Sequence, residues 1–209
     1  TRSYSVTGVQ TCALPICRNR QNWQTWTKAD ATHGGYDDVA YIEGGTCHNF
    51  GWYVPSDKYF AEHPEYYALD KDGKTRLPTG KVGDPGWHEI GGLCLTHPEV
   101  RKIVLAKLLE AIAADRAKFN TPDQPPPEIY SVSQSDNGVL CHCPACRELV
   151  KREGSESGPL IEFINEIADG VRENYPAVKV QTEAYYWSQI PPKTLDRKST
   201  RLNSSHRIR

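Results

Sequence analysis

A run of polar side chains follows a short stretch of β-forming residues near the middle of the chain. Residues 129–132 favour a buried strand, and residues 133–138 read Ser-Gln-Ser-Asp-Asn-Gly, which is typical of a turn. The loops that follow the carboxyl ends of parallel strands are where α/β folds bind substrates. We therefore expect Asp136 to be a catalytic carboxylate, with Gln134 and Asn137 beside it as hydrogen-bonding groups for the substrate. The alternative is that Asp136 only caps the Asn-Gly turn.

A second carboxylate, Glu183, lies near the end of the next predicted strand, residues 178–185. Adjacent strands are about 4.8 Å apart, so Asp136 and Glu183 would lie close enough to act on the two sides of a glycosidic bond. Hydrolysis of such a bond needs one carboxyl group as a proton donor and a second one as a nucleophile or base. The alternative is that Glu183 faces solvent or a helix.

A group of aromatic and polar residues fits the same chemistry. Aromatic rings pack against the apolar face of a pyranose, and imidazole and amide groups bind hydroxyls or a uronate. On this basis we assign substrate binding to His48, Asn49, Trp52 and Tyr185. For the first three, a loop packed against the rest of the fold is the alternative. The other histidines have no pattern that sets them apart, namely His63, His88, His97 and His142.

Cys141, Cys143 and Cys146 form a Cys-x-Cys-x2-Cys sequence. Three thiols at this spacing resemble half of a zinc site, whereas complete zinc sites commonly carry two Cys-x2-Cys pairs. A fourth ligand would be His142, Cys94 or Cys47. We expect buried thiols or one disulfide and no cofactor, with a bound zinc ion as the alternative. No Cys-His pair has a context that indicates a nucleophile.

The elements that would position these groups alternate along the chain. The sequence predicts a hairpin around Asp72-Gly73, helices over residues 57–63, 97–119 and 157–174, and strands over residues 93–95, 129–132 and 178–185. Thr96 and Glu99 have the spacing of a capping box at the start of the second helix. The order β-α-β-α-β favours an α/β fold with a parallel sheet. Because a complete barrel needs roughly 250 residues, we expect a partial (β/α)8 TIM-type barrel that is truncated at both ends.

The two ends of the chain are related to each other at the level of DNA. Residues 6–16 and 196–206 back-translate to strings that are reverse complements and that match a common sequencing adapter. Such complementarity is not expected within one natural reading frame. We therefore interpret residues 1–17 and 196–209 as adapter-derived, and residues 18–195 as a fragment of a barrel domain.

The charge balance argues against two classes of partner. The whole chain has 25 Lys and Arg against 26 Asp and Glu. Setting the two ends aside removes six basic residues and one acidic residue, so the remainder is acidic. No basic patch therefore argues for nucleic acid, and no apolar run is long enough to span a membrane.

Several longer strings of the sequence resemble a known family. Residues 48–55, 59–74, 93–102, 129–158 and 163–176 are similar to the bacterial domain of unknown function 4838, which is distantly related to α-glucuronidases and other barrel glycoside hydrolases. The resemblance covers residues 48–193. It implies a glycoside hydrolase-like (β/α)8 domain that acts on an oligo- or polysaccharide, such as a complex or uronic-acid-containing glycan, and it suggests export to the periplasm or the exterior. A non-catalytic glycan-binding or structural barrel is the alternative.

Overall fold

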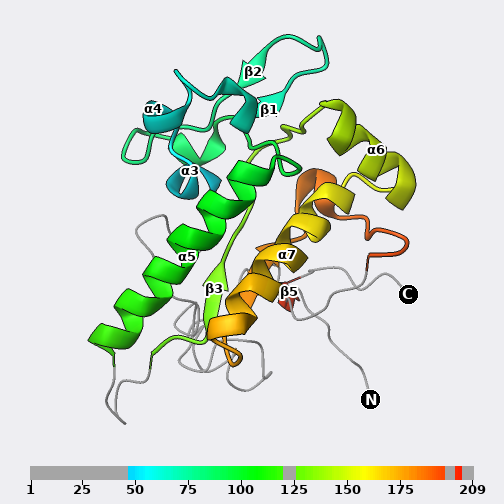
Figure 1. The fold of residues 1–209 in the computed structure, drawn as a ribbon. Coiled ribbons are helices and arrows are strands. Elements are labelled where there is room, and N and C mark those ends of the chain that lie inside the picture. The colour runs from blue at the N-terminus through cyan, green and yellow to red at the C-terminus, as the bar shows by residue number, and fades with distance from the viewer. Residues whose placement is uncertain (1–46, 120–125, 196–200, 204–209) are drawn as a thin grey trace, which may run out of the picture.

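A computed structural model describes residues 47–119, 126–195 and 201–203 (Figure 1). The segment 1–17, interpreted above as adapter-derived, lies outside the described residues. In the segment 196–209, only the backbone of residues 201–203 is described.

The centre of the fold is a parallel pair of short strands, β3 (Ile129–Ser131) and β4 (Lys179–Glu183). A third strand, β5 (Arg201–Asn203), comes from the segment interpreted above as adapter-derived and pairs with β4 in the order β3-β4-β5. Tyr130 lies opposite Val180 in the register of the first pair. Because β3 and β4 run in the same direction, their carboxyl ends meet at one edge of the sheet. The strands predicted over residues 129–132 and 178–185 are confirmed, although β4 ends earlier than predicted.

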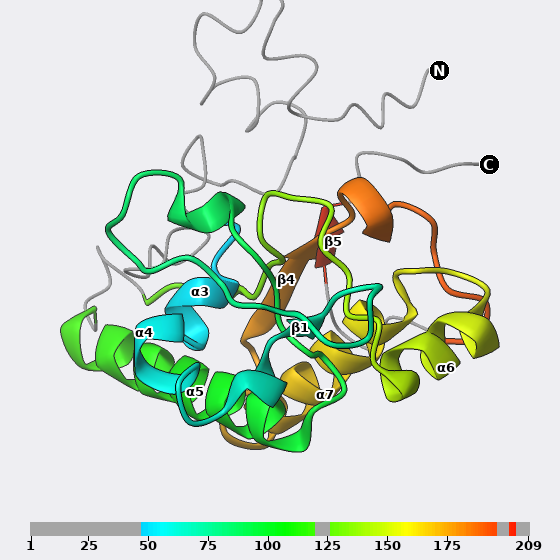
Figure 2. The ribbon, with the colours of Figure 1, turned by 90° about the horizontal axis from the view of Figure 1, so that it is seen from above.

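Two long helices cover one face of this sheet (Figures 1 and 2), namely α5 (Pro98–Lys118) and α7 (Gly158–Asn174). They lie side by side, and α7 also packs against β4. Their apolar stripes are buried in one core, as the sequence predicts: Val100, Val104, Leu108, Ile112, Leu160, Ile164, Ile167 and Val171. Burial of each large aliphatic side chain is worth about 1.5–3 kcal/mol, so this helical layer holds the short strands in place.

The start of α5 differs from the prediction. Its N-cap is His97, whose Nδ1 accepts a hydrogen bond from the backbone N–H of Glu99 at 3.3 Å. The Glu99 carboxylate pairs with Lys102 rather than reaching back to Thr96. The predicted capping box is therefore wrong, because the imidazole of His97 occupies the capping position and Thr96 lies outside the helix.

Helix α6 (Pro144–Glu153) is absent from the sequence-based prediction. Cys143 caps its first turn, and Gly154 ends it with a left-handed φ of 63°. The helix buries Cys146, Leu149 and Glu153. Cys146 and Leu149 are three residues apart and share the buried face, but the sequence-based prediction assigns this segment to the loop of the cysteines and so misses the helix.

The region before α5 consists of short elements: α3 (Phe50–Tyr53), α4 (Ser56–Tyr59), η2 (Pro64–Tyr66), β1 (Ala68–Leu69), β2 (Arg76–Leu77) and η3 (Trp87–Glu89). The antiparallel pair β1-β2 confirms the predicted hairpin, and α4 takes the place of the helix predicted over residues 57–63. The segment 93–95 is not a strand of the parallel sheet, because Leu93 forms a single antiparallel bridge with Tyr67. The described residues thus form a mixed α/β fold, and they do not close into a barrel.

One side chain closes the edge of β3 that faces away from β4. Nδ2 of Asn49 donates to the carbonyl of Ser131 at 3.0 Å, and its Oδ1 accepts the N–H of Ser133 at 2.8 Å. The backbone N–H of Asn49 also donates to the carbonyl of Ser133 at 3.1 Å. The fully buried Asn49 therefore makes the hydrogen bonds that a neighbouring strand would make, and it fixes His48 beside the end of β3.

Candidate functional site

The carboxyl ends of β3 and β4 bring several of the predicted site residues together. Glu183 is the last residue of β4, and Asp136 lies in the loop that follows β3. Nδ1 of His48 lies 3.5 Å from Oε2 of Glu183 and 2.9 Å from the carbonyl oxygen of Gln134. The negative charge of Asp136 acts on both Glu183 and Tyr185. We call His48, Asp136, Glu183 and Tyr185 the rim group.

Glu183 lies in an environment that disfavours its charge. Its Oε2 is buried and receives no hydrogen bond from the described residues, since the shorter contact of His48 Nδ1 is the one to Gln134. Burial raises the pKa of Glu183, and the charge of Asp136 raises it further, whereas a positive charge on His48 would lower it. A carboxyl group in this environment holds its proton to a higher pH than a solvated glutamate.

His48 and the two tyrosines after β4 form the aromatic part of the site. The ring of His48 lies 5.7 Å from that of Tyr185 and stacks at 6.5 Å on that of His88. Partial burial, and then the charge and hydrogen bond of Asp136, raise the pKa of Tyr185. His48 and Tyr186 have left-handed φ values of 53° and 52°. Residues other than glycine rarely adopt this backbone conformation, and such strain is concentrated at functional sites.

Two of the predicted binding residues lie at the rim but are occupied by internal hydrogen bonds. Nε2 of Gln134 donates to the carbonyl of Tyr185 at 2.8 Å, and its Oε1 accepts the hydroxyl of Ser188 at 2.8 Å. Gln134 therefore ties the loop after β3 to the turn η4 (Tyr186–Ser188). Nδ2 of Asn137 donates to the carbonyls of Glu89 and Gly91, and its Oδ1 accepts the N–H of Val139. Both side chains fix the shape of the site.

Asn49 and Trp52 are not brought to the rim group. Asn49 closes the edge of β3, as described above. The ring of Trp52 packs edge-on against Tyr53, and Nζ of Lys107 lies 4.1 Å above it. Lys107 belongs to α5, so Trp52 contributes to the helical layer.

Two residues beside the rim group were not singled out by the sequence. The carbonyl of His88 accepts the backbone N–H of Asp136 at 2.8 Å, which places this histidine next to the predicted acid. Tyr186 is 55% exposed and packs edge-on against Tyr185 at 4.8 Å. His88 comes from a Gly- and Pro-rich loop without periodicity, so no sequence pattern marks it. The aromatic run Tyr185-Tyr-Trp187 is a signal that could have identified Tyr186.

A pocket in the described part of the fold lies next to the rim group without containing its carboxylates. Its lining includes Gln134, Ser135 and Asn137 from the loop after β3, together with apolar side chains and two cysteines, Cys141 and Cys146. Neither Asp136 nor Glu183 lines it. The pocket therefore does not identify where a substrate would meet the two acids.

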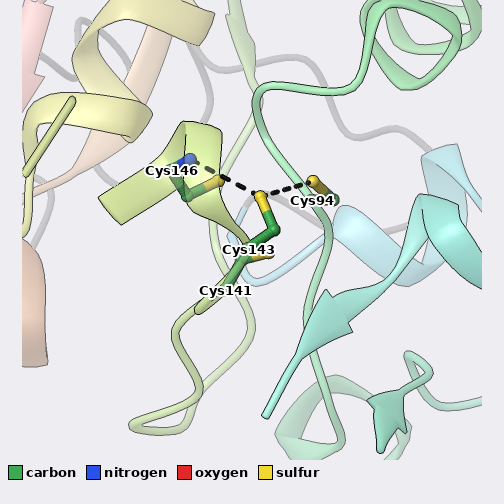
Figure 3. A group of neighbouring side chains, drawn as sticks. All are labelled: Cys94, Cys141, Cys143 and Cys146. Carbon is green, nitrogen blue, oxygen red and sulfur yellow. Dashed lines mark hydrogen bonds between the residues drawn. The ribbon is translucent and has the colours of Figure 1, made fainter. Parts of the chain in front are cut away.

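Two groups of side chains among the described residues have the composition of a metal site. The first is Cys94, Cys141, Cys143 and Cys146, whose sulfur atoms all lie within 4.8 Å of one another (Figure 3). We call these four residues the cysteine cluster. The second is Cys47, His48 and Glu183, which overlaps the rim group. Neither His142 nor Cys47 joins the cysteine cluster, so Cys94 is the one of the three predicted fourth ligands that the fold brings there.

None of the five cysteines in the described segments forms a disulfide. Hydrogen bonds from the neighbouring thiols, that of Cys141 above all, hold the pKa of Cys143 below its usual range. One stretch of chain connects the two sites. Asp136 of the rim group lies in the loop that follows β3, and the same loop leads to Cys141, Cys143 and Cys146 at the start of α6.

Among the described residues, no helix combines the length and the apolar character needed to cross a membrane.

Comparisons with known proteins identify the family of the chain. Neither the curated proteins nor the solved structures contain a match to the chain. A family model, however, matches residues 10–200, which is nearly the whole chain, and the chain therefore belongs to the family described as Domain of unknown function (DUF4838).

Proposed function

We propose that the rim group is the active site of a carbohydrate-active, glycoside hydrolase-like domain. The observation that carries this proposal is that Asp136 and Glu183 follow adjacent parallel strands and interact electrostatically, with a raised pKa on Glu183. Glycoside hydrolysis needs two carboxyl groups in different protonation states, one to donate a proton and one to act as nucleophile or base. Burial and the charge of Asp136 both raise the pKa of Glu183, which suits this glutamate to the role of the proton donor.

The roles of the two acids follow from their environments. Glu183, whose pKa is raised, would donate a proton to the oxygen of the leaving group. Asp136 would be the partner that attacks the anomeric carbon or activates a water molecule. The exposed rings of Tyr185 and Tyr186 would stack on a sugar face, and His48 and His88 would supply donors to hydroxyls or to a uronate carboxylate. The substrate class is accordingly a complex or uronic-acid-containing oligo- or polysaccharide.

The fold supports this proposal at a coarser level. A strand, a helical crossover and a second parallel strand, with chemistry-bearing loops at the carboxyl ends, are the repeating unit of (β/α)8 barrels. We propose that β3, α7 and β4 form such a unit, and that the described residues are part of a barrel of this type.

The proposal is tested with two charge-removing variants of the full chain, Asp136→Asn and Glu183→Gln. Each should lower kcat/KM on uronic-acid-containing oligosaccharides by at least about 10²-fold, with reducing-end release as the measurement. Glu173→Gln is the matched control, because Glu173 is exposed at the far end of α7 and should keep full activity. Unchanged turnover in both rim variants would remove the catalytic assignment.

The second candidate function is non-catalytic glycan binding. It is favoured by the exposure of Tyr185 and Tyr186 at the rim, since exposed aromatic rings are sufficient for binding a sugar without hydrolysis. Isothermal titration with the same oligosaccharides separates the two. Binding without product release supports the glycan-binding module, whereas product release supports the hydrolase.

A further inference from the structure

The cysteine cluster has the geometry of a mononuclear thiolate site. The sulfur atoms of Cys94 and Cys143 lie 3.6 Å apart, and all four lie within 4.8 Å of one another. Four sulfur atoms arranged tetrahedrally around an ion at the usual Zn–S bond length of about 2.3 Å are about 3.8 Å from one another. We propose that Cys94, Cys141, Cys143 and Cys146 bind one Zn²⁺ ion, in a closed site that serves the structure rather than the chemistry.

The contacts around the sulfur atoms favour thiolates. The backbone N–H of Leu69 donates to Sγ of Cys141 at 3.4 Å, and that of Cys146 donates to Sγ of Cys143 at 3.5 Å. The hydroxyl of Thr96 lies 3.2 Å from Sγ of Cys146 and 3.6–3.7 Å from the sulfur atoms of Cys94 and Cys143. Cys143 and Cys146 also sit at the amino-terminal end of α6, where the helix dipole stabilises negative charge. These groups would offset the charge of four thiolates around a divalent ion.

The composition of the cluster selects the metal. Four sulfur ligands with no carboxylate exclude magnesium and calcium, which take oxygen ligands, and favour zinc or iron. In iron–sulfur clusters the cysteines bind different iron atoms, so their sulfur atoms are spread around a larger body. The close approach of all four sulfur atoms therefore favours a single ion. A disulfide would use two of the four thiols and leave the other two packed against it.

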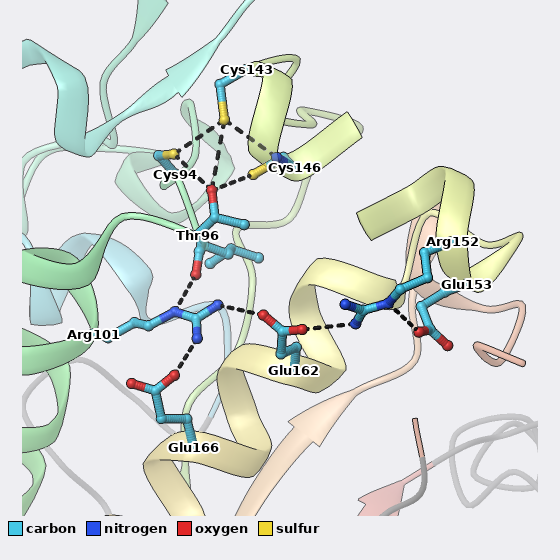
Figure 4. A network of polar contacts seen from close by, with 10 residues as sticks. Cys94, Thr96, Arg101, Cys143, Cys146, Arg152, Glu153, Glu162 and Glu166 are labelled. Carbon is cyan, nitrogen blue, oxygen red and sulfur yellow. Dashed lines mark hydrogen bonds and ion pairs between the residues drawn. The ribbon is translucent and has the colours of Figure 1, made fainter. Parts of the chain in front are cut away.

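The position of the cluster explains what the ion would do. Cys94 precedes α5, whereas Cys141 and Cys143 precede α6 and Cys146 lies in its first turn. The ion would therefore tie together two segments that are distant in sequence. The loop before α6 begins at the rim group, and its far end would be held by zinc. On the other side, Nε of Arg101 donates to the carbonyl of Leu95 at 2.8 Å, and the Arg101 guanidinium pairs with Glu162 of α7 (Figure 4). The cluster thus joins the starts of α5 and α6 to the helical layer.

Metal content tests the proposal on the full chain. The chain is produced in zinc-supplemented medium, purified without a chelating resin, and analysed for zinc, iron and protein. We expect about one zinc per chain, and Cys143→Ser should reduce this to a small fraction because three thiolates bind zinc far more weakly than four. Cys47→Ser is the matched control, since this thiol lies outside the cluster, and it should keep its zinc.

Loss of zinc in Cys47→Ser together with retention of zinc in Cys143→Ser would overturn the assignment. Stoichiometric iron would also overturn it. So would a disulfide between any two of the four cysteines, detected by peptide mapping without reduction. If Cys143→Ser does not fold, the unaltered chain decides the matter through cobalt. Replacement of zinc by Co²⁺ should give the visible absorption bands of tetrahedral cobalt with sulfur ligands, and the same bands in Cys47→Ser. A folded chain that retains no zinc and gives no such bands would also overturn the proposal.

Discussion

Two glutamates, the fully buried Glu153 and the partly buried Glu183, have opposite environments. Glu153 at the end of α6 is fully buried, and its carboxylate accepts the backbone N–H groups of Thr194 and Leu195 as well as the Thr194 hydroxyl. These hydrogen bonds, the one from Thr194 above all, together with Arg152, lower the pKa of Glu153 to about 2. Glu183 has a buried oxygen without a donor among the described residues, and burial raises its pKa.

Under the proposed function, the difference separates a carboxylate that stabilises the fold from one that takes part in the reaction. A carboxylate that is surrounded by hydrogen-bond donors is stabilised in its ionised form. It also fixes the chain that supplies the donors, here residues 193–195 beside Glu153. An acid that is buried without donors is destabilising for the fold, and such groups persist where a proton must be held or transferred. The contrast between Glu153 and Glu183 therefore supports the proposed role of the rim group, and it can be tested by replacing each glutamate with glutamine.

The largest effect is expected for Glu153→Gln. The amide would present N–H groups to the donors of Thr194 and Leu195, so buried hydrogen bonds would be lost on both sides. We expect the melting temperature at pH 7 to fall by on the order of 5 °C, and the segment after Pro191 to become a site of proteolysis. The control is Glu156→Gln, which removes a partly exposed ion pair with Arg147 and should change the melting temperature little. Equal effects in the two variants would show that Glu153 is not an anchor.

The pH dependence of stability should have opposite signs for the two acids. The pKa of Glu153 is lowered from 4.5 to about 2 in the fold, so its contribution is present above pH 4.5 and is lost as the pH falls from 4.5 toward 2. The melting temperatures of the wild type and of Glu153→Gln should therefore converge over that range. For Glu183 the pKa is raised, so its contribution is present below pH 4.5 and is lost as the pH rises through the folded value. Thermal melts of both variants at a series of pH values check the two signs.

A smaller gain of stability is expected for Glu183→Gln at neutral pH. The neutral amide removes the cost of a buried charge without a donor, and sites of function are commonly stabilised when such a group is removed. A rise in melting temperature of roughly 2–4 °C corresponds to about 1 kcal/mol in a chain of this size. A clear loss of stability in this variant would mean that Glu183 has a structural partner, and the contrast with Glu153 would fail.

Much of the fold is predictable from local patterns, as the helical stripes of α5 and α7 and the strand residues of β3 show. The spacing of cysteines in the sequence also indicates a site. The fourth member, Cys94, is 47 residues away from Cys141, so only the packing of the loop before α5 against the loop before α6 selects it from three candidates. Hydrogen-bonding side chains such as Asn49 and Asn137 were predicted to bind substrate. The residue type alone does not distinguish an asparagine side chain that binds a ligand from one that makes hydrogen bonds with backbone N–H and C=O groups.

The smallest effect is expected at the strained tyrosine of the rim. Glycine adopts the φ of 52° at position 186 without strain, whereas alanine does not. Tyr186→Gly should therefore melt higher than Tyr186→Ala by roughly 2 °C, which reflects the backbone alone. Both variants should bind oligosaccharide more weakly than the wild type in a titration. If the two variants melt at the same temperature, the backbone at this position is not strained.

The amide of Asn49, which completes the edge of β3, has a consequence for the behaviour of the protein in concentrated solution. A parallel strand with unpaired N–H and C=O groups is a template on which another chain can add its own strand, and natural sheets block such edges. Asn49 blocks this one together with Tyr53 of α3, whose hydroxyl also donates to the carbonyl of Ser131 at 2.8 Å. An Asn49→Leu chain would keep the size of the side chain but would leave the N–H of Ser133 without its acceptor, so the edge should be held less firmly and the variant should form aggregates at concentrations at which the wild type remains dispersed. Asn49, which the sequence predicts to bind substrate, is therefore expected to limit self-association of the protein.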